Sequence, residues 1–170
     1  MNKLIHTSIE GFNIRFAEDE DVTLILKFIK NLAEYEKLSH EVMATEEILR
    51  ESLFNKNMAE VIIGEHNDKP IGFALFFHSF STFLGRPGIY LEDLFIVEEM
   101  RGKGFGKVML SFLAKLAIDR NCGRLEWWCL NWNNASIQFY RSIEAIPMDE
   151  WTTFRLAGKE LYNLAREFKG

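Results

Sequence analysis

The residues from Tyr90 to Gly106, YLEDLFIVEEMRGKGFG, combine two chemical features in one short segment. The acidic pair Glu92-Asp93 lies in an apolar run, and a carboxylate in such a place could take part in an acid–base step. Three alternating glycines follow within Arg101–Gly106, and a helical pattern comes directly after them. Glycines let bare N–H groups approach an anion, and a helix N-terminus adds unpaired donors. The segment therefore predicts a phosphate-binding loop near an acid–base residue.

The glycine loop alone is weak evidence, because the same residues also suit a flexible connection. No Gly-Lys-Ser/Thr ending follows the glycines, which excludes a Walker loop. The glycines run G-x-G-x-G after the fourth predicted strand, which does not fit the dinucleotide-binding fingerprint. The position between a strand and a helix nevertheless favours a phosphate site of another kind.

The elements around this loop can be predicted from apolar periodicity. Alternation predicts a strand over Phe12–Phe16, and the acidic cluster Glu18–Asp21 is expected to open a helix. Thr45 is expected to cap a second helix. Two strands, Ala59–His66 and Ile71–Ser79, are expected to form an antiparallel hairpin.

The turn of that hairpin is predicted at Asn67–Pro70, and Phe80–Pro87 is predicted to be a loop. A strand over Gly88–Val97 precedes the glycine loop, and the helix after the loop is expected to end at Asn121-Cys122-Gly123. A strand–helix–strand unit of this kind pairs in parallel. The remaining predicted elements are strands Arg124–Leu130 and Trp151–Leu156 and helices Ala135–Ile143 and Lys159–Phe168. The predicted class is α/β with a mixed sheet in a single domain over residues 1–170.

Composition limits the function classes. The chain has 170 residues and a net charge of −5, which suits a cationic substrate and argues against nucleic acid as a partner. Cys122 and Cys129 are too few to staple the fold and are expected to be reduced. No apolar run reaches the ~20 residues of a membrane span, and the N-terminus lacks a signal-peptide core. Cytoplasmic localisation is expected. The four His residues are scattered, and no metal site is expected.

Two motifs carry a family resemblance. Arg101-Gly102-Lys103-Gly104-Phe105-Gly106 matches the Arg/Gln-x-x-Gly-x-Gly/Ala signature of the GCN5-related N-acetyltransferases (GNAT), and Asn131–Tyr140, NWNNASIQFY, resembles a second segment of that family. The match narrows to the spermidine/spermine (diamine) N-acetyltransferases through Leu32–Glu36, Tyr90–Phe95 and Met148–Trp151. The resemblance implies a GNAT-like, mostly antiparallel central sheet flanked by helices, acetyl-CoA as cosubstrate, and a homodimer.

The resemblance also implies which residues hold acetyl-CoA. In that family the loop N–H groups hold the pyrophosphate and the preceding strand offers backbone groups to the pantetheine arm. The implied coenzyme-binding residues are Leu94, Phe95, Ile96, Arg101, Gly102, Lys103, Gly104, Phe105, Gly106, Lys107, Asn133 and Ser136. The alternative for Asn133 is a helix cap.

Acetyl transfer to an amine requires the neutral amine. A primary amine with a pKa near ~10.4 is neutral in about one molecule in 10³ at pH 7, which costs roughly 4–5 kcal/mol. Glu92 is the candidate base, directly or through a water; its alternative is an exposed or Arg-paired Glu. Asp93 should alternate to the other face of the strand. Tyr140 lies near the coenzyme sulfur by resemblance and can donate to the departing thiolate.

Substrate selection should come from carboxylates that meet cationic nitrogens. By resemblance, Tyr35 and Glu36 lie beside the substrate channel, Glu92 lies at its reactive end, and Glu150 lines the other side. Glu36 could equally be a solvated charge at a helix end. One departure concerns Glu144, where the family usually has Gly. That position ends a helix in a left-handed conformation, so Glu144 puts the local turn in question.

The sequence thus predicts an N-acetyltransferase acting on a small primary amine. A polyamine or diamine is the first expected substrate, and a lysine-like amino acid such as thialysine is the second. Two alternatives stay open: a non-catalytic acetyl-CoA-binding or interaction protein, and an acetyltransferase that modifies Lys or the N-terminus of proteins.

Overall fold

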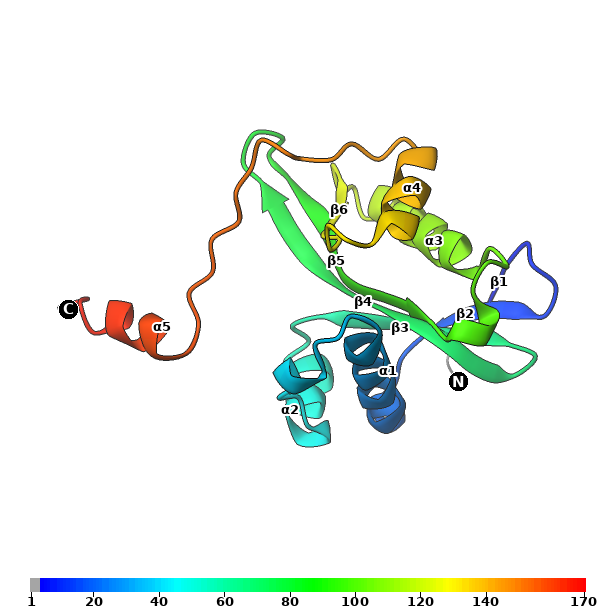
Figure 1. The fold of residues 1–170 in the computed structure, drawn as a ribbon, viewed down its shortest axis with the longest axis horizontal. Helices are drawn as coiled ribbons and strands as arrows, with labels where there is room; N and C mark the ends of the chain where they lie inside the picture. Colours follow the sequence, from blue (N-terminus) through cyan, green and yellow to red (C-terminus); the bar gives the residue numbers. More distant parts are fainter. Residues whose placement is uncertain (1–3) are drawn as a thin grey trace. The chain divides into compact units, whose positions relative to one another are not determined.

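The computed structural model describes residues 4–170 and divides the chain into two compact units, one up to Trp128 and one from Cys129 to Gly170. The first unit contains a six-stranded sheet with the strand order β1-β2-β3-β4-β5-β6 (Figure 1). All neighbours are antiparallel except β5 and β6, which are parallel. The mixed, mostly antiparallel sheet is therefore confirmed. Its strands are β1 Ile5–His6, β2 Phe12–Phe16, β3 Glu60–His66, β4 Lys69–Ser81, β5 Arg86–Ile96 and β6 Leu125–Trp127.

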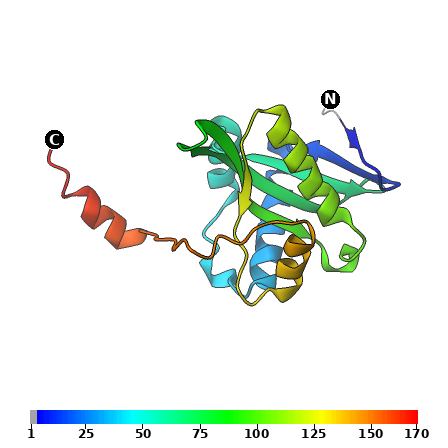
Figure 2. The same cartoon turned by 90° about the horizontal axis from the view of Figure 1, so that it is seen from above.

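Helices cover both faces of this sheet. Figure 1 shows α1 and α2 on one face and α3 on the other, and Figure 2 shows α3 lying along its face. The helices of the first unit are η1 Asp19–Asp21, α1 Val22–Tyr35, η2 Ser39–Glu41, α2 Glu46–Arg50, the π-helix η3 Glu51–Asn55, η4 Glu98–Met100 and α3 Phe105–Asp119. The second unit contains α4 Asn134–Ser142 and α5 Gly158–Ala165.

The core on the α1 face follows from the helical spacing of apolar residues in α1. Val22, Ile25 and Phe28 are buried against residues of β3, β4 and β5. The rings of Phe28 and Phe73 stack with their centroids 5.6 Å apart. Burying side chains of this size stabilises the fold by roughly 1.5–3 kcal/mol each, so α1 is firmly held against the sheet.

The core on the α3 face depends on a close approach of α3 to strands β2 and β3. Phe12 of β2 packs against Phe105 of α3 with ring centroids 4.6 Å apart. A Cβ added to Gly64 would lie 2.9 Å from the Phe12 ring and 3.1 Å from the Met109 sulfur. The glycine in β3 thus lets α3 approach the sheet closely, and this contact sets the position of the N-terminus of α3.

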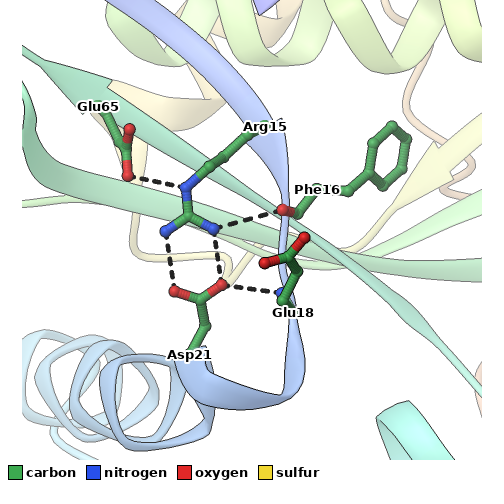
Figure 3. Close-up of polar contacts among 5 residues, drawn as sticks. All are labelled: Arg15, Phe16, Glu18, Asp21 and Glu65. Carbon is green, nitrogen blue, oxygen red and sulfur yellow. Dashed lines mark hydrogen bonds and ion pairs between the residues drawn. The ribbon is translucent and has the colours of Figure 1, made fainter. Parts of the chain in front are cut away.

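Arg15 joins the start of α1 to the sheet (Figure 3). Its guanidinium donates to both carboxylate oxygens of Asp21 at 2.6 and 2.8 Å and to Glu65 at 2.8 Å. Asp21 also accepts the backbone N–H of Glu18 at 2.8 Å. Burial raises the pKa of Asp21, but the hydrogen bonds from Arg15 and Glu18 outweigh this, so the net pKa lies below the usual value.

Most predicted elements are confirmed, with shifted ends. Thr45 caps α2 by accepting the N–H of Ile48. The hairpin turn comprises only Asn67-Asp68, both at positive φ, because Lys69 and Pro70 already pair with β3. The predicted loop Phe80–Pro87 is wrong at both ends: Phe80 pairs with Pro87, and only residues 82–85 lie outside the strands.

Two predicted strands need correction. Arg124–Leu130 forms strand only over Leu125–Trp127, since its pairing with β5 spans only those residues. Trp151–Leu156 is not a strand: within residues 4–170 no strand pairs with it, and an extended segment becomes a strand only beside a hydrogen-bonding neighbour. Among the same residues no helix is long and apolar enough to cross a membrane. Neither Cys122 nor Cys129 forms a disulfide.

Candidate functional site

The glycine loop, Arg101–Gly106, begins directly after η4, and its last two residues are the first two of α3. Gly102 and Gly104 adopt positive φ values of 74° and 88°, so both positions favour glycine for conformational reasons. A Cβ at Gly102 would meet nothing within 4 Å, so the loop surface is open there. Gly104 is the N-cap of α3 and has no side chain that could cap the first N–H groups. An anion could therefore bind these donors.

The other residues of the loop differ in what their side chains can do. Phe105 is buried and contacts the rings of Phe12 and His66, so only its backbone is available to a ligand. The Lys103 ammonium donates to the Glu99 carbonyl at 3.0 Å. Lys107 is exposed, whereas Gly106 is partly buried without a positive φ. The structure thus brings the predicted coenzyme-binding residues of the loop together at one helix N-terminus.

The second half of β5 has an open backbone edge. Pairing with β6 covers only residues Ile89 to Leu91. Within the described residues 4–170, no strand pairs with Leu94, Phe95 or Ile96 on that side. An extended ligand could form backbone hydrogen bonds along such an edge. The Ile96 carbonyl is already used, because it accepts Nε–H of Arg101 at 2.8 Å.

A β-bulge lies at the acidic pair. Leu91 pairs with Phe76 and Asp93 with Leu75, which are consecutive residues of β4, so Glu92 has no partner across the pair. Because Phe76 and Leu75 point to opposite faces, Leu91 and Asp93 do too. Asp93 therefore lies on the α1 face, where Leu75 packs against the core. The register of β5 against β4 gives the face of Asp93 but not that of Glu92, so the separation of the two side chains stays a prediction.

The bulge creates a cluster of three carboxylates, Glu36, Glu92 and Asp93. Burial, together with the charges of Glu92 and Glu36, raises the pKa of Asp93 to about 6. Burial also raises the pKa of Glu36. Within residues 4–170, no Lys, Arg or His forms an ion pair with any of the three. This carboxylate cluster has the charge and partial burial expected of a site for a cation.

Glu36 and Tyr35 are positioned by the end of α1. Tyr35 is the last helical residue, and Glu36 is the C-cap. Lys37 follows at φ 61°, and Leu38 N–H donates to the Ala33 carbonyl at 2.7 Å, as in a Schellman motif. The motif stops α1 where Glu36 can approach Asp93 closely enough to influence its pKa.

A groove of about 840 Å³ lies on the side of the sheet that α1 covers. It runs between α1, the β3–β4 turn and the residues after β5, and Tyr35, Phe95 and Arg101 line it. Glu92 and Asp93 do not line it. The groove and the carboxylate cluster are therefore distinct features that meet at Tyr35. No group of three or more His, Cys, Asp or Glu suited to a metal ion occurs among residues 4–170.

The second unit holds the other predicted site residues and is described by itself. Asn133 caps α4 by accepting the N–H of Ser136 at 3.2 Å, so its cap role is confirmed. Burial raises the pKa of Tyr140 to about 12, and the nearby Cys129 thiol contributes to the shift. The phenol of Tyr140 is therefore a proton-bearing hydrogen-bond donor at neutral pH. Glu150 is exposed in the segment between α4 and α5.

The turn after α4 is retained despite its unusual residue. Glu144 adopts φ 63°, its N–H donates to the Arg141 carbonyl at 3.0 Å, and Ala145 N–H donates to the Tyr140 carbonyl at 3.1 Å. This is a Schellman motif with Glu144 in the place usually taken by Gly. The left-handed turn is thus formed at the expected position, at a conformational cost of about 1–2 kcal/mol.

Two features were not predicted from the sequence. The bulge at Glu92 and the placement of Asp93 in the carboxylate cluster had one signal, two adjacent carboxylates inside an apolar strand. The contact between Arg101 and Tyr35, with the guanidinium carbon 4.3 Å from the ring centroid, had no signal in the spacing of those residues.

Comparisons with known proteins agree with this geometry. The family model described as "Acetyltransferase (GNAT) family" matches residues 26–143. The thialysine N-epsilon-acetyltransferase of Bos taurus is 35% identical over 164 residues, covering 89% of this chain and 96% of its own. The L-ornithine N5-acetyltransferase NATA1 of Arabidopsis thaliana is 32% identical, covering 87% of this chain and 85% of its own.

A solved structure supports the fold. The integron cassette protein VCH_CASS6 from the mobile metagenome of V.cholerae superposes with a TM-score of 0.78 at 28% identity, covering 93% of this chain and 99% of its own. The family-model match spans well over half of the chain, so sequence and fold point to the same family.

Proposed function

The chain belongs to the acetyltransferase (GNAT) family and is an N-acetyltransferase, and we propose that it acetylates a primary amine of a small cationic substrate, first a polyamine or diamine. The observation that carries this proposal is the carboxylate cluster of Glu36, Glu92 and Asp93, which has no cationic side chain paired with it within residues 4–170. A substrate ammonium would supply the missing positive charge.

The cluster suits substrate deprotonation as well as binding. Glu92 is the proposed base, and Asp93 lies close enough for the two charges to interact. A carboxylate whose pKa is raised to about 6 is a stronger base than an ordinary Asp, yet it remains mostly ionised at pH 7.5. Asp93 can therefore take up a proton passed from the amine through Glu92 or a water. This sharing offsets part of the roughly 4–5 kcal/mol needed to make the amine neutral at pH 7.

The loop residues fit the coenzyme that GNAT proteins use. The open surface at Gly102 and the uncapped N-terminus of α3 suit a pyrophosphate. Bound acetyl-CoA would supply the acetyl group as a thioester. The backbone of Gly102, Gly104 and Phe105 would hold the phosphates, and the open edge of β5 at Leu94 would align the pantetheine arm.

Tyr140 is proposed to stabilise the departing sulfur. With a pKa raised to about 12 against ~8.5 for a thiol, full proton transfer would be uphill by roughly 5 kcal/mol. Hydrogen bonding by the phenol, with the proton kept on oxygen, is therefore the favoured role. The proton on the final thiol would then come from solvent or from the carboxylate cluster.

Diamines precede lysine-like amino acids in this proposal because of charge. A thialysine or ornithine substrate carries a carboxylate of its own, which three acidic side chains would repel. A diamine presents a second ammonium that Glu36 can bind. The relatives that act on thialysine and ornithine nevertheless make those amino acids the second candidates.

Thiol release with a panel of amines tests the proposal. The panel comprises spermidine, a short diamine, a monoamine of equal length, thialysine, ornithine and a Lys-containing peptide. We expect the highest kcat/KM for the polyamine or diamine. Turnover of the peptide alone would replace the proposal with a protein acetyltransferase. Loss of all turnover while acetyl-CoA still binds would remove it.

Replacing Tyr140 by Phe tests the chemical step separately. The expected loss in kcat is about 10²-fold or more, as for a missing acid–base group, with the Kd for acetyl-CoA unchanged in calorimetry.

The oligomeric state and the localisation are also proposals: a homodimer and the cytoplasm. Light scattering coupled to gel filtration tests the first, and cell fractionation tests the second.

A further inference from the structure

Arg101 is the first residue of the glycine loop, but its side chain contacts other parts of the protein. Nε–H donates to the Ile96 carbonyl at 2.8 Å. The guanidinium carbon lies 4.3 Å from the centroid of the Tyr35 ring and 5.4 Å from that of Phe95. Both distances are within the range of a cation–π contact. We call this group of Arg101, Tyr35 and Phe95 the arginine stack.

The arginine stack joins three segments that are distant in the chain. Arg101 belongs to the start of the loop, Phe95 to the end of β5 and Tyr35 to the last turn of α1. Phe95 is 5% exposed and is held firmly in the core, whereas Tyr35 is 39% exposed and is only partly covered by its neighbours. The guanidinium therefore connects a rigid strand to the less buried end of a helix.

The residue after Tyr35 is a member of the carboxylate cluster. Glu36 is the C-cap of α1, and its charge influences Asp93. The backbone of Tyr35 and Glu36 is continuous with the Schellman motif at Lys37. A displacement of the end of α1 at Tyr35 would therefore move Glu36 relative to Asp93.

We propose that Arg101 is a positioning residue for the amine. The arginine stack holds the end of α1 so that Glu36 stays close to the other two carboxylates of the cluster, and Arg101 is not a ligand of the coenzyme phosphates. The inference rests on the proposed function and deepens it. Its cause lies in the geometry, since one guanidinium edge is used by Ile96 and its face is covered by Tyr35. Backbone N–H groups of the loop remain to bind the phosphates.

Kinetics of Arg101→Gln and Arg101→Lys distinguish the two roles. For Arg101→Gln we expect the KM for a diamine to rise roughly 3- to 30-fold, the range of a partly desolvated cation–π contact. The Kd for acetyl-CoA, measured by calorimetry, should stay as in the wild type. Arg101→Lys should be intermediate, because an ammonium can still lie over the Tyr35 ring but cannot reproduce the fork of an Arg.

Tyr35 variants separate positioning from a general loss of folding. Tyr35→Phe keeps the ring and should raise the diamine KM less than Tyr35→Leu, which should raise it as Arg101→Gln does. The double variant Arg101→Gln/Tyr35→Leu should be no worse than either single one, because the two residues act as one unit. Arg50→Gln is the matched control: it removes an Arg of α2 that pairs with Asp19, and it should change neither the diamine KM nor the Kd for acetyl-CoA.

The opposite pattern would overturn the inference. A raised Kd for acetyl-CoA with an unchanged diamine KM in Arg101→Gln would make Arg101 a phosphate ligand. Additive effects in the double variant would also contradict it. If Arg101→Gln unfolds, as judged by circular dichroism, the Arg101→Lys and Tyr35→Leu pair gives the same decision.

A measurement independent of turnover separates this inference from the proposed function. The Nε–H resonance of Arg101 should be shifted upfield by the Tyr35 ring, should move in Tyr35→Leu, and should persist at saturating acetyl-CoA. Loss of the shift on coenzyme binding would overturn the inference. If no amine is acetylated, the proposed function fails, and calorimetric binding of spermidine to Arg101→Gln and wild type still decides whether Arg101 positions an amine site.

Discussion

Two groups of carboxylates in the first unit have opposite electrostatic surroundings. Asp21 and Glu65 accept hydrogen bonds of 2.6–2.8 Å from one partly buried guanidinium, that of Arg15. Glu36, Glu92 and Asp93 are close enough for their charges to interact, and among residues 4–170 they form no ion pair with a cationic side chain. The pKa of Asp21 is accordingly lowered, and that of Asp93 is raised to about 6.

The difference shows how the same residue types serve structure in one place and recognition in another. An acid whose folded pKa is lowered stabilises the fold above its unfolded pKa, and this stabilisation is lost as pH falls through the folded pKa. An acid whose folded pKa is raised does the reverse and penalises folding once it ionises. The Arg15 group therefore stabilises the fold by itself, whereas the carboxylate cluster lowers stability until a cation binds. The predictions below test this contrast.

Arg15→Met should have the largest effect. It leaves Asp21 and Glu65 partly buried without their cation, and breaking such a group costs about 3–4 kcal/mol of the free energy of unfolding. Urea denaturation at pH 7 measures the loss. The loss should shrink at pH 3, where protonation of Asp21 removes an uncompensated charge. Lys115→Met, which removes an exposed i,i+4 pair with Asp119, is the control and should cost under about 1 kcal/mol.

Asp93→Asn should stabilise the protein. The pKa of Asp93 rises from 3.8 to about 6, roughly two units, and at about 1.4 kcal/mol per unit the ionised form costs about 2–3 kcal/mol. The substitution should recover much of that amount above pH 6. The gain should fade between pH 6 and pH 4, because Asp93 is then protonated in the folded state.

Denaturation of Asp93→Asn and wild type at pH 8 and pH 4 measures this gain. Spermidine at saturating concentration should reduce the difference at pH 8, since a bound cation relieves the same penalty. Equal stabilities at pH 8 without ligand would show that Asp93 already has a cationic partner, and the contrast with Asp21 would then be lost.

Glu36→Gln should have a smaller effect, confined to substrates with two ammonium groups. A partly exposed ion pair contributes up to about 1 kcal/mol, so we expect the KM for a diamine to rise roughly five-fold. The KM for a monoamine of equal length should not change. Glu20→Gln, at an exposed Glu in η1 just before α1, is the matched control. An equal rise for both amines would place Glu36 at the reacting nitrogen instead.

The sheet and its loop could be predicted because their signals are local. Apolar alternation marks Phe12–Phe16 as a strand, and the glycines at Gly102 and Gly104 take the positive φ values that the loop requires. The bulge at Glu92 could not be predicted in this way, because it arises from the register between β5 and β4. Simple alternation along β5 alone therefore does not give the face on which Asp93 lies.

The same limit applies to contacts and to the C-terminal segment. Arg101 and Tyr35 meet only because α1 and the end of β5 pack on one face, which neither local sequence encodes. Trp151–Leu156 has the composition of a strand, but composition cannot supply the neighbouring strand that pairing needs. The sequence thus predicted features that depend on neighbouring residues, whereas contacts and strand pairing between distant segments required the structure.

Glu144→Gly should have no effect on activity and only a small one on stability, and it provides a baseline from a carboxylate outside both groups. Glu144 adopts φ 63°, where glycine carries no Cβ penalty. The variant should gain about 1 kcal/mol in the free energy of unfolding. The gain should be the same at pH 4 and pH 8, because it arises from backbone strain, whereas the gain in Asp93→Asn depends on pH. Since the turn is already formed, kcat should not change. A rise in kcat would mean that Glu144 disturbs Tyr140, and a pH-dependent gain would assign its cost to charge.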